Sequence, residues 1–293
     1  MRPRTRALAV AAVAAALAGA VGAGTAARPV SGSRAWPLDD LPARLDRLVA
    51  WQPGASGVEW GELQVGGAGE AWRTRVAVAR VDPKRVALAL EPAFADGRRW
   101  VVAETGPPAA LAVNAGQFRG SLPWGWVVAG GRQLLSPRSA PLAGAVVVDR
   151  DGAVRIVPPG EVAAEQRRGT AREAFQSYPM LLVDGATPEP LLRRGLGVAV
   201  AHRDARLALG TAPDGRVIIA LTRFDALGPA LGRLPFGLTS AEMAAVMRAL
   251  GCRDAILLDG GISGQLMVRD AAGHPHTWPG IRSVPLGLIG RTR

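Results

Sequence analysis

From Val58 onward the chain consists of strand-length apolar runs separated by turn residues, and this pattern restricts it to strand-rich folds. Typical runs are "VEWGELQV", "RVALALEP", "ALAVNAGQF", "MLLVDG" and "AILLDGG". Gly, Pro and Asp-Gly pairs separate them, and the Asp-Gly pairs of "DRDGAV" and "APDGRV" predict tight hairpins. No regular alternation of strand and helix appears, which disfavours a doubly wound parallel sheet. We predict an α+β fold with strand-rich antiparallel or mixed sheets, few helices and a single main domain over residues 58–293.

One helix is clear in the sequence "LTSAEMAAVMRALG". Thr239 followed by Glu242 three residues later is the pattern of a capping box, so the helix begins after Thr239. Gly251 is suited to end it. Its apolar face is expected to contain Met243, Val246, Met247 and Leu250.

The N-terminal segment predicts export. Three arginines precede an apolar stretch and then small residues, as in a secretory signal peptide, here residues 1–27. Residues 28–57 are expected to form a linker with a short helix around Leu41–Trp51. No other stretch is long and apolar enough to span a membrane, so no stable membrane insertion is expected after cleavage and the mature protein should be secreted or periplasmic.

Composition excludes several functional classes. With 48% hydrophobic and 20% charged residues, the chain is expected to fold rather than to be disordered. The net charge of +11 is almost all arginine, and no block of like charges or interleaved aromatic residues predicts nucleic-acid binding. Affinity for anionic substrates remains compatible with it. Cys252 is the only cysteine, so there is no intrachain disulfide, and its setting predicts a core residue.

Common catalytic motifs are missing. The sequence has no G-x-S-x-G, H-E-x-x-H or P-loop pattern. His274 and His276 form a His-x-His pair in a Pro-bounded segment, but no further ligands for a metal can be placed beside them, so an exposed loop pair is the preferred interpretation. No cofactor and no metal are expected.

Polar residues recur at the ends of apolar strands. Asn114, Asp184 and Asp259 each follow such a run and precede Gly or Ala-Gly. Each could be a simple turn residue. Together with Arg206 and the nearby His202, they also fit one shared cleft.

The stretch "AILLDGGISGQLMV" (255–268) has two interpretations of this kind. Asp-Gly between apolar runs is a hairpin signal. The second interpretation, which is compatible with the first, is that Asp259 is an acid at a strand end and that Gly260 and Gly261 let a ligand approach the backbone.

The order of several segments resembles the phosphodiester glycosidase family, which includes N-acetylglucosamine-1-phosphodiester α-N-acetylglucosaminidase and bacterial exopolysaccharide-associated relatives. The similar segments, spanning about residues 58–290, are "NAGQF", "YPMLLVDG", "RLALG", "GLTSAEMAAVMRALG", "LLDGGISG" and "RSVPLGLIG". The chain departs from the family pattern at five positions: Ala115, Gln117, Leu207, Ile262 and Gly264.

The resemblance implies an exported glycosidase that hydrolyses a sugar-1-phosphodiester in a glycan or cell-envelope polymer. It implies catalytic roles for Asp259, for Asp184 as a second carboxyl and for Arg206 as a phosphate clamp. Trp124 and Trp126 could stack on sugar rings or serve in packing. The substrate-binding residues that it implies are Asn114, Gly116, Phe118, His202, Gly260, Gly261 and Ser263.

Two alternatives stay open on the sequence. One is a catalytically silent relative that binds envelope glycans or anionic polymers through the same cleft. The other is a structural envelope protein, in which the polar strand ends would share no pocket.

Overall fold

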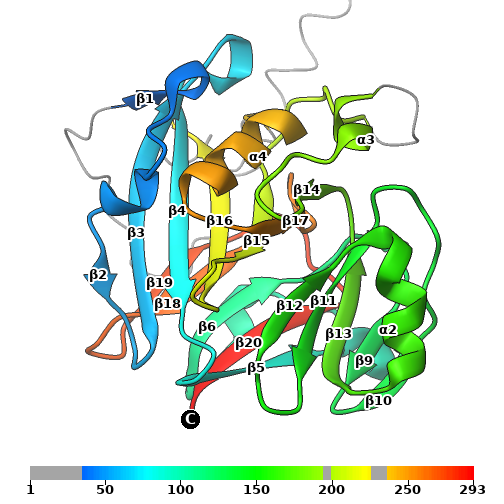
Figure 1. Ribbon diagram of the computed structural model, residues 1–293. Helices are drawn as coiled ribbons and strands as arrows, with labels where there is room; N and C mark the ends of the chain where they lie inside the picture. Colours follow the sequence, from blue (N-terminus) through cyan, green and yellow to red (C-terminus); the bar gives the residue numbers. More distant parts are fainter. Residues whose placement is uncertain (1–34, 194–198, 226–235) are drawn as a thin grey trace, which may run out of the picture.

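The computed structural model describes residues 35–193, 199–225 and 236–293. The predicted signal peptide, residues 1–27, lies outside these ranges. Within them, no helix is long and apolar enough to cross a membrane. The described chain forms a single strand-rich domain with few helices, which confirms the predicted class (Figure 1).

The largest sheet has eight strands in the order β1-β3-β4-β16-β15-β17-β14, with β2 also paired to β3. Its pairings are antiparallel except for the parallel pair β1–β3. Its strands are β1 (Ala35–Pro37), β2 (Gln52–Pro53), β3 (Val58–Gly66), β4 (Thr74–Val81), β14 (Met180–Leu182), β15 (Leu207–Thr211), β16 (Val217–Phe224) and β17 (Asp254–Leu257).

Strands β14, β15, β16 and β17 of this sheet are buried along their whole length, which explains why they are apolar at most positions. On β15, Leu207 and Leu209 join the core that the sheet shares with the other sheets, while Ala208 faces the core beneath α4. The predicted hairpin at Asp214 and Gly215 joins β15 to β16, with Gly215 at φ +83°.

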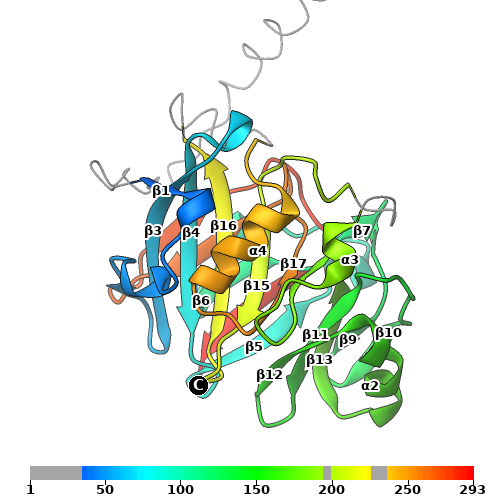
Figure 2. The ribbon, with the colours of Figure 1, turned by 45° about the horizontal axis from the view of Figure 1, so that its top comes forward.

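Helix α4 (Ser240–Ala249) covers one face of this sheet (Figure 2). The predicted capping box is confirmed: the Thr239 hydroxyl accepts from the Glu242 amide, and the Glu242 carboxylate accepts from the Thr239 amide. Gly251 follows the helix with φ +87°, as its predicted end requires. The four predicted core residues of its apolar face are buried, and Cys252 is buried beside them.

A five-stranded sheet, in the order β19-β18-β6-β20-β5, packs against the other face of the large sheet. Its strands are β5 (Val86–Glu91), β6 (Ala109–Asn114), β18 (Leu266–Arg269), β19 (Pro275–Trp278) and β20 (Gly287–Thr292). All its pairings are antiparallel. The central strand β6 is buried along its whole length, so it ends at Asn114 inside the protein.

A second five-stranded sheet, in the order β10-β9-β13-β11-β12, carries helix α2 (Val162–Arg168) on its outer face (Figure 1). Its strands are β9 (Val127–Ala129), β10 (Arg132–Leu135), β11 (Gly144–Asp149), β12 (Val154–Val157) and β13 (Ala171–Ser177). The predicted Asp-Gly hairpin at Asp151 and Gly152 joins β11 to β12. The remaining elements are the hairpin β7 (Phe118–Arg119) and β8 (Leu122–Pro123), and the short helix α3 (Glu189–Leu192).

The segment expected to be a linker with a helix around Leu41–Trp51 has a different local structure. It contains 3-10 turns at Leu38–Asp40 and Leu45–Arg47, and its ends pair with β3 as β1 and β2. Leu41 precedes Pro42 and is extended (φ −73°, ψ 134°), as expected for a residue before proline. Leu45 is fully buried, so the segment packs onto the large sheet.

The hairpin interpretation of residues 255–268 is wrong. β17 belongs to the eight-stranded sheet and β18 to a five-stranded one, so the two strands do not pair. The Asp-Gly-Gly segment instead carries the chain from one sheet to the other. Asp259 therefore lies where the two sheets meet.

Candidate active site

Asp259 is held at the junction between the two sheets by backbone hydrogen bonds. Its amide donates to the Ala115 carbonyl (3.1 Å), just after β6. Its own carbonyl accepts from the Asn114 side chain (2.6 Å). The end of β6 thus fixes the main chain at Asp259, while the Asp259 side chain is partly accessible.

The surroundings of the Asp259 carboxyl favour its protonated form. Burial raises its pKa to about 6, outweighing a hydrogen bond from Ser263 and the positive charge of Arg282, which both lower it; the negative charge of Asp204 raises it further. Oδ2 has no hydrogen-bond partner in the described part of the chain, although it is buried. A carboxyl group poised near neutrality, with an unused oxygen, is suited to proton transfer.

Gly260 and Gly261 allow close packing of the main chain at this turn. A Cβ on Gly260 would lie 2.4 Å from the Ala205 carbonyl oxygen, and Gly261 has φ +56°. The Gly261 amide donates to the same Ala205 carbonyl (2.6 Å). A Cβ on Gly261 would lie 3.0 Å from a carboxylate oxygen of Asp204. These glycines therefore bring Asp204 next to the Asp259 turn.

Arg206 lies beside this turn, but its guanidinium is engaged by the protein. Its Nε donates to the Leu238 carbonyl (2.8 Å) and its Nη2 to the His202 carbonyl. Burial lowers the pKa of Arg206, and the charges of Asp204 and Glu242 oppose that effect. Arg206 thus holds the segment before β15 against the start of α4. The His202 side chain is exposed, and this residue contributes its main-chain carbonyl to the bond with Arg206.

Asn114 and Gly116 support the site from within the core. Asn114 is fully buried, and its Oδ1 accepts from the Gln265 amide (2.8 Å) while its Nδ2 binds the Asp259 carbonyl. Both ends of its amide are therefore used inside the protein. A Cβ on Gly116 would lie 2.3 Å from the Gln176 carbonyl oxygen, which explains glycine there.

Gln117 joins three segments around Asp259. Its Nε2 donates to the carbonyls of Tyr178 and Leu258, and its Oε1 accepts from the Ser177 hydroxyl (2.7 Å) and the Tyr178 amide (3.0 Å). Tyr178 is thereby placed near Asp259, and burial, followed by the charge of Asp259, raises the pKa of its phenol. Trp124 contacts the Tyr178 ring edge-on, with centroids 4.9 Å apart.

Trp126 is a packing residue. Its side chain is 1% exposed and belongs to the core under α2. Of the two tryptophans in "LPWGWVV", only Trp124 therefore lies near the site.

Arg282 supplies a positive charge that acts on the Asp259 carboxyl. Its guanidinium lies over the Phe118 ring, 4.7 Å from the centroid, and Arg99 lies over the same ring at 5.0 Å. Arg99 is bonded to the Gly120 and Ser283 carbonyls, whereas Arg282 is exposed, and no described residue makes a hydrogen bond or ion pair to its guanidinium. Arg282 is thus available to an anionic ligand, whereas Arg99 and Arg206 are bonded to main-chain carbonyls.

The structure does not bring Asp184 to this site. Asp184 follows β14 near the start of β17: its amide donates to the Asp254 carboxylate (2.9 Å), and its side chain, 79% exposed, pairs with Arg253 (3.4 Å). Because β14 and β17 are antiparallel, Asp184 lies at the opposite end of β17 from Asp259. The acid beside Asp259 is Asp204 instead.

Most departures from the family pattern lie in packed regions. Ala115 and Leu207 are fully buried core residues, and Gly264 packs against Leu221. Gln117 is fully engaged in the hydrogen bonds given above. Ile262 is the departure that faces solvent, with 40% of its surface exposed. None of the five replaces Asp259, Ser263 or Arg282.

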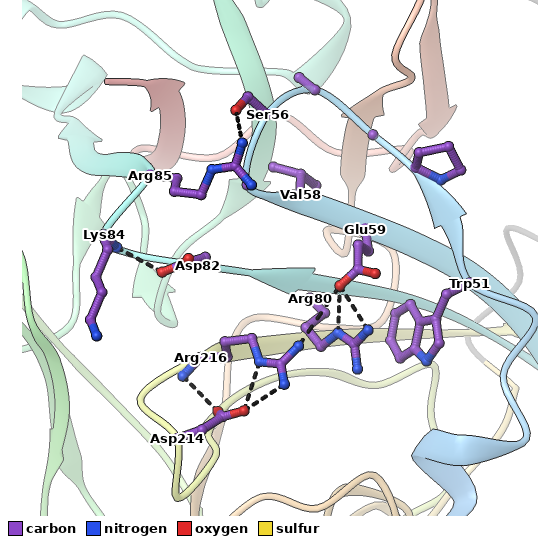
Figure 3. A pocket seen from close by; sticks show the side chains of 14 residues that line it. Trp51, Ser56, Val58, Glu59, Arg80, Asp82, Lys84, Arg85, Asp214 and Arg216 are labelled. Carbon is purple, nitrogen blue, oxygen red and sulfur yellow. Dashed lines mark hydrogen bonds and ion pairs between the residues drawn. The ribbon is translucent and has the colours of Figure 1, made fainter.

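A separate cleft of about 680 Å³ lies at the other end of the large sheet, near the β15–β16 turn (Figure 3). Its charged walls are largely paired, for example Arg80 with Glu59 (2.7 Å) and Arg216 with Asp214 (2.6 Å). It contains none of the predicted site residues.

His276 lies on β19, where it stacks on Trp60 (centroids 4.3 Å apart) and contacts Asp270 at 3.2 Å. His274 contacts the same carboxylate at 3.4 Å. Within the residues that the structure describes, no group of three or more His, Cys, Asp or Glu is placed to hold a metal ion.

Three site residues were not predicted from the sequence: Asp204, Tyr178 and Arg282. Asp204 and Arg282 follow no strand-end pattern, and only the fold brings "HRDAR" and "GIRSV" beside the Asp259 turn. Their signal was position: each belongs to, or directly precedes, a segment that carried the family resemblance.

Comparison with known proteins agrees with this architecture. The family model "Phosphodiester glycosidase" matches residues 108–289. This is more than half of the chain and includes Asp259, Ser263 and Arg282, so the chain belongs to the phosphodiester glycosidase family. No curated protein matches the chain.

Three solved structures share the fold at low identity. The zebrafish N-acetylglucosamine-1-phosphodiester α-N-acetylglucosaminidase catalytic domain, auto-inhibited by its pro-peptide, has a TM-score of 0.62 and 15% identity, covering 84% of this chain and 88% of that one. A hypothetical protein from Synechocystis has a TM-score of 0.57 and 15% identity, covering 81% and 62%. A putative exported protein from Burkholderia pseudomallei has a TM-score of 0.50 and 16% identity, covering 75% and 74%. At such identities they show the fold alone.

Proposed function

We propose that this protein is an exported hydrolase that cleaves a sugar-1-phosphodiester bond in a glycan or cell-envelope polymer. The observation that carries the proposal is the Asp259 carboxyl, whose pKa burial raises to about 6, with a free oxygen and with Arg282 close enough to act on its charge. Membership of the phosphodiester glycosidase family supports hydrolysis as the reaction. Export rests on the N-terminal sequence.

The chemistry requires a base and a cation more than an acid. The departing phosphate monoester already carries negative charge, so it needs less protonation than an ordinary sugar leaving group. In the proposed reaction, the Asp259 carboxylate takes a proton from water, the water oxygen bonds to the sugar C1, and the C1–O bond to phosphate breaks. Arg282 neutralises the departing phosphate through its guanidinium.

Asp204 and Ser263 tune the base. The negative charge of Asp204 raises the pKa of Asp259, and the Ser263 hydroxyl keeps the carboxyl oriented by a hydrogen bond. A raised pKa makes Asp259 a stronger base than an ordinary carboxylate. Asp184 has no part in this mechanism because it lies at the other end of β17.

The test is release of free sugar from a panel of sugar-1-phosphodiesters by the purified protein and by Asp259→Asn. We expect turnover by the unaltered protein and a loss of at least ~100-fold in Asp259→Asn, the scale of losing a positioned base. Asp184→Asn is the matched control and should keep near-normal turnover. Saturable binding of these compounds with no released sugar would favour the silent glycan-binding alternative.

A further inference from the structure

Two exposed isoleucines lie side by side next to the candidate site. Ile262 is 40% exposed and Ile281 is 47% exposed. The Ile281 amide donates to the Ile262 carbonyl (2.8 Å), so their main chains are in direct contact. When a ligand covers the exposed part of a large aliphatic side chain, apolar surface is removed from water, and this stabilises the complex.

This pair is built into the site rather than scattered on the surface. Ile262 lies in the turn that begins at Gly260, where the Ser263 and Gly264 amides both donate to the Gly260 carbonyl (3.0 and 3.1 Å). The Arg282 amide donates to the same Ile262 carbonyl as Ile281 does, at 3.1 Å. Asp259, Ile262, Ile281 and Arg282 are therefore linked within two short segments.

The two segments are also packed tightly against each other. A Cβ on Gly280 would lie 2.9 Å from the Ser263 carbonyl oxygen and 3.2 Å from that of Ile262. The isoleucines are thus held in place beside the acid and the cation by main-chain contacts.

We infer that the phosphodiester substrate carries an apolar alcohol on its phosphate, and that Ile262 and Ile281 bind this alcohol. The inference rests on the proposed function and specifies the substrate class of the same site. In a phosphodiester, the first carbon of the alcohol is bonded to a phosphate oxygen. Because the main chains of Ile281 and Arg282 both bond to the Ile262 carbonyl, we expect a phosphate held by Arg282 to bring the alcohol within reach of Ile281 and Ile262.

The polarity of this position distinguishes substrate classes. A second sugar on the phosphate would present hydroxyl groups to two aliphatic side chains, which offer them no hydrogen bonds, so those hydroxyls would lose water without compensation. An alkyl or isoprenoid alcohol would instead bury its methylene groups there. The substrate class is a sugar 1-phosphate esterified to a lipid-like alcohol.

The experiment compares methyl and octyl esters of one sugar 1-phosphate, used below the micellar concentration. The sugar is the best one of the panel, or N-acetylglucosamine if none is turned over. The kcat/KM for each ester is measured in the unaltered protein, Ile262→Ser, Ile281→Ser and the double variant. Leu48→Ser is the control, because Leu48 is similarly exposed (51%) but lies among the elements at the other end of the large sheet. Binding of both esters to Asp259→Asn, with and without the isoleucine substitutions, is measured by calorimetry.

We expect the unaltered protein to prefer the octyl ester by about tenfold or more in kcat/KM, the range that apolar pockets achieve. In the double variant this preference should fall to about twofold or less, because kcat/KM decreases for the octyl ester and not for the methyl ester. In Leu48→Ser the preference should stay unchanged. Equal hydrolysis of both esters, or a preference that survives the double variant, overturns the inference but leaves the proposed function standing. Isoleucine-dependent preference in binding without any hydrolysis overturns the proposed function and keeps the apolar subsite. Absence of both binding and hydrolysis overturns both.

Discussion

The carboxyl of Asp259 is subject to opposing influences, and their balance determines its chemistry. Burial and the charge of Asp204 disfavour ionisation, while Arg282 and Ser263 favour it. Burial dominates, so the native protein holds the proton more tightly than an unfolded chain would. The raised pKa thus makes Asp259 a stronger base and lowers the stability of the folded protein at pH values where Asp259 is ionised.

This cost can be measured as a function of pH. The pKa of Asp259 is about 6 in the folded chain against 3.8 for an ordinary Asp. The folded state therefore becomes relatively less stable as the pH rises from about 4 through 6. We expect Asp259→Asn to raise the free energy of unfolding at pH 7 by about 1–3 kcal/mol, the upper value being the full shift, and to have little effect below about pH 4.

Denaturant unfolding at pH 4 and pH 7 checks this, with Asp184→Asn as control. The Asp184 side chain is exposed, so its substitution should change stability by less than about 0.5 kcal/mol at either pH. A destabilised Asp259→Asn protein at pH 7 would contradict the balance described above.

The two arginines at the site should respond differently to truncation. Arg282→Ala removes an exposed guanidinium, so we expect kcat/KM for a sugar-1-phosphodiester to fall by about 10- to 100-fold with the melting temperature nearly unchanged. Arg206→Ala removes the bonds to Leu238 and His202 and should lower the melting temperature. Equal loss of activity in Arg282→Ala and in Arg119→Ala, a β7 control, would count against a phosphate role for Arg282.

At the scale of elements, the site depends on how closely the turn after β17 approaches the segment before β15. Gly260 permits that approach, since a Cβ there would meet the Ala205 carbonyl oxygen at 2.4 Å. That oxygen belongs to the main chain and cannot move aside without shifting Asp204 and Arg206. The geometry of the two carboxyl groups is therefore set by glycine.

We expect Gly260→Ala to destabilise the protein by about 1–3 kcal/mol, the cost of overpacking a rigid region, and to reduce turnover together with it. Gly160→Ala is a matched control, because a Cβ there would meet nothing within 4 Å. Thermal unfolding of both variants is the measurement. Equal stability of the two variants would show that the turn can move away from Ala205.

Elements with a local signal were predictable, and those that depend on distant contacts were not. The capping box and the two Asp-Gly hairpins are each specified by four or five consecutive residues, and all three are present in the structure. The Asp-Gly pair at Asp259 gives the same local signal but joins two sheets, because each flanking strand finds partners far away in sequence. The local sequence pattern at Asp259 indicates that the chain turns. It does not determine which strand β18 pairs with.

At the scale of the whole molecule, the site arises from the meeting of two sheets. Asn114 ends β6 in one sheet and holds the Asp259 carbonyl beyond β17 in the other. The sequence indicated both residues by their position at strand ends. Asp184 had the same signature. Because β14 runs antiparallel to β17, however, Asp184 lies at the opposite end of β17 from Asp259. Asp204 and Arg282 lacked this strand-end signature, because only the assembled fold brings them to Asp259.

The pH dependence of kcat/KM for a sugar-1-phosphodiester tests the central claim most directly, since the claim is that ionised Asp259 is the base. With the pKa of Asp259 raised to about 6, we predict a rate that rises tenfold per pH unit below about 6 and levels off above it. The same limb should be missing from the residual activity of Asp259→Asn. A rate that falls as the pH passes through 6, or that stays flat between pH 4.5 and 8, would contradict the account.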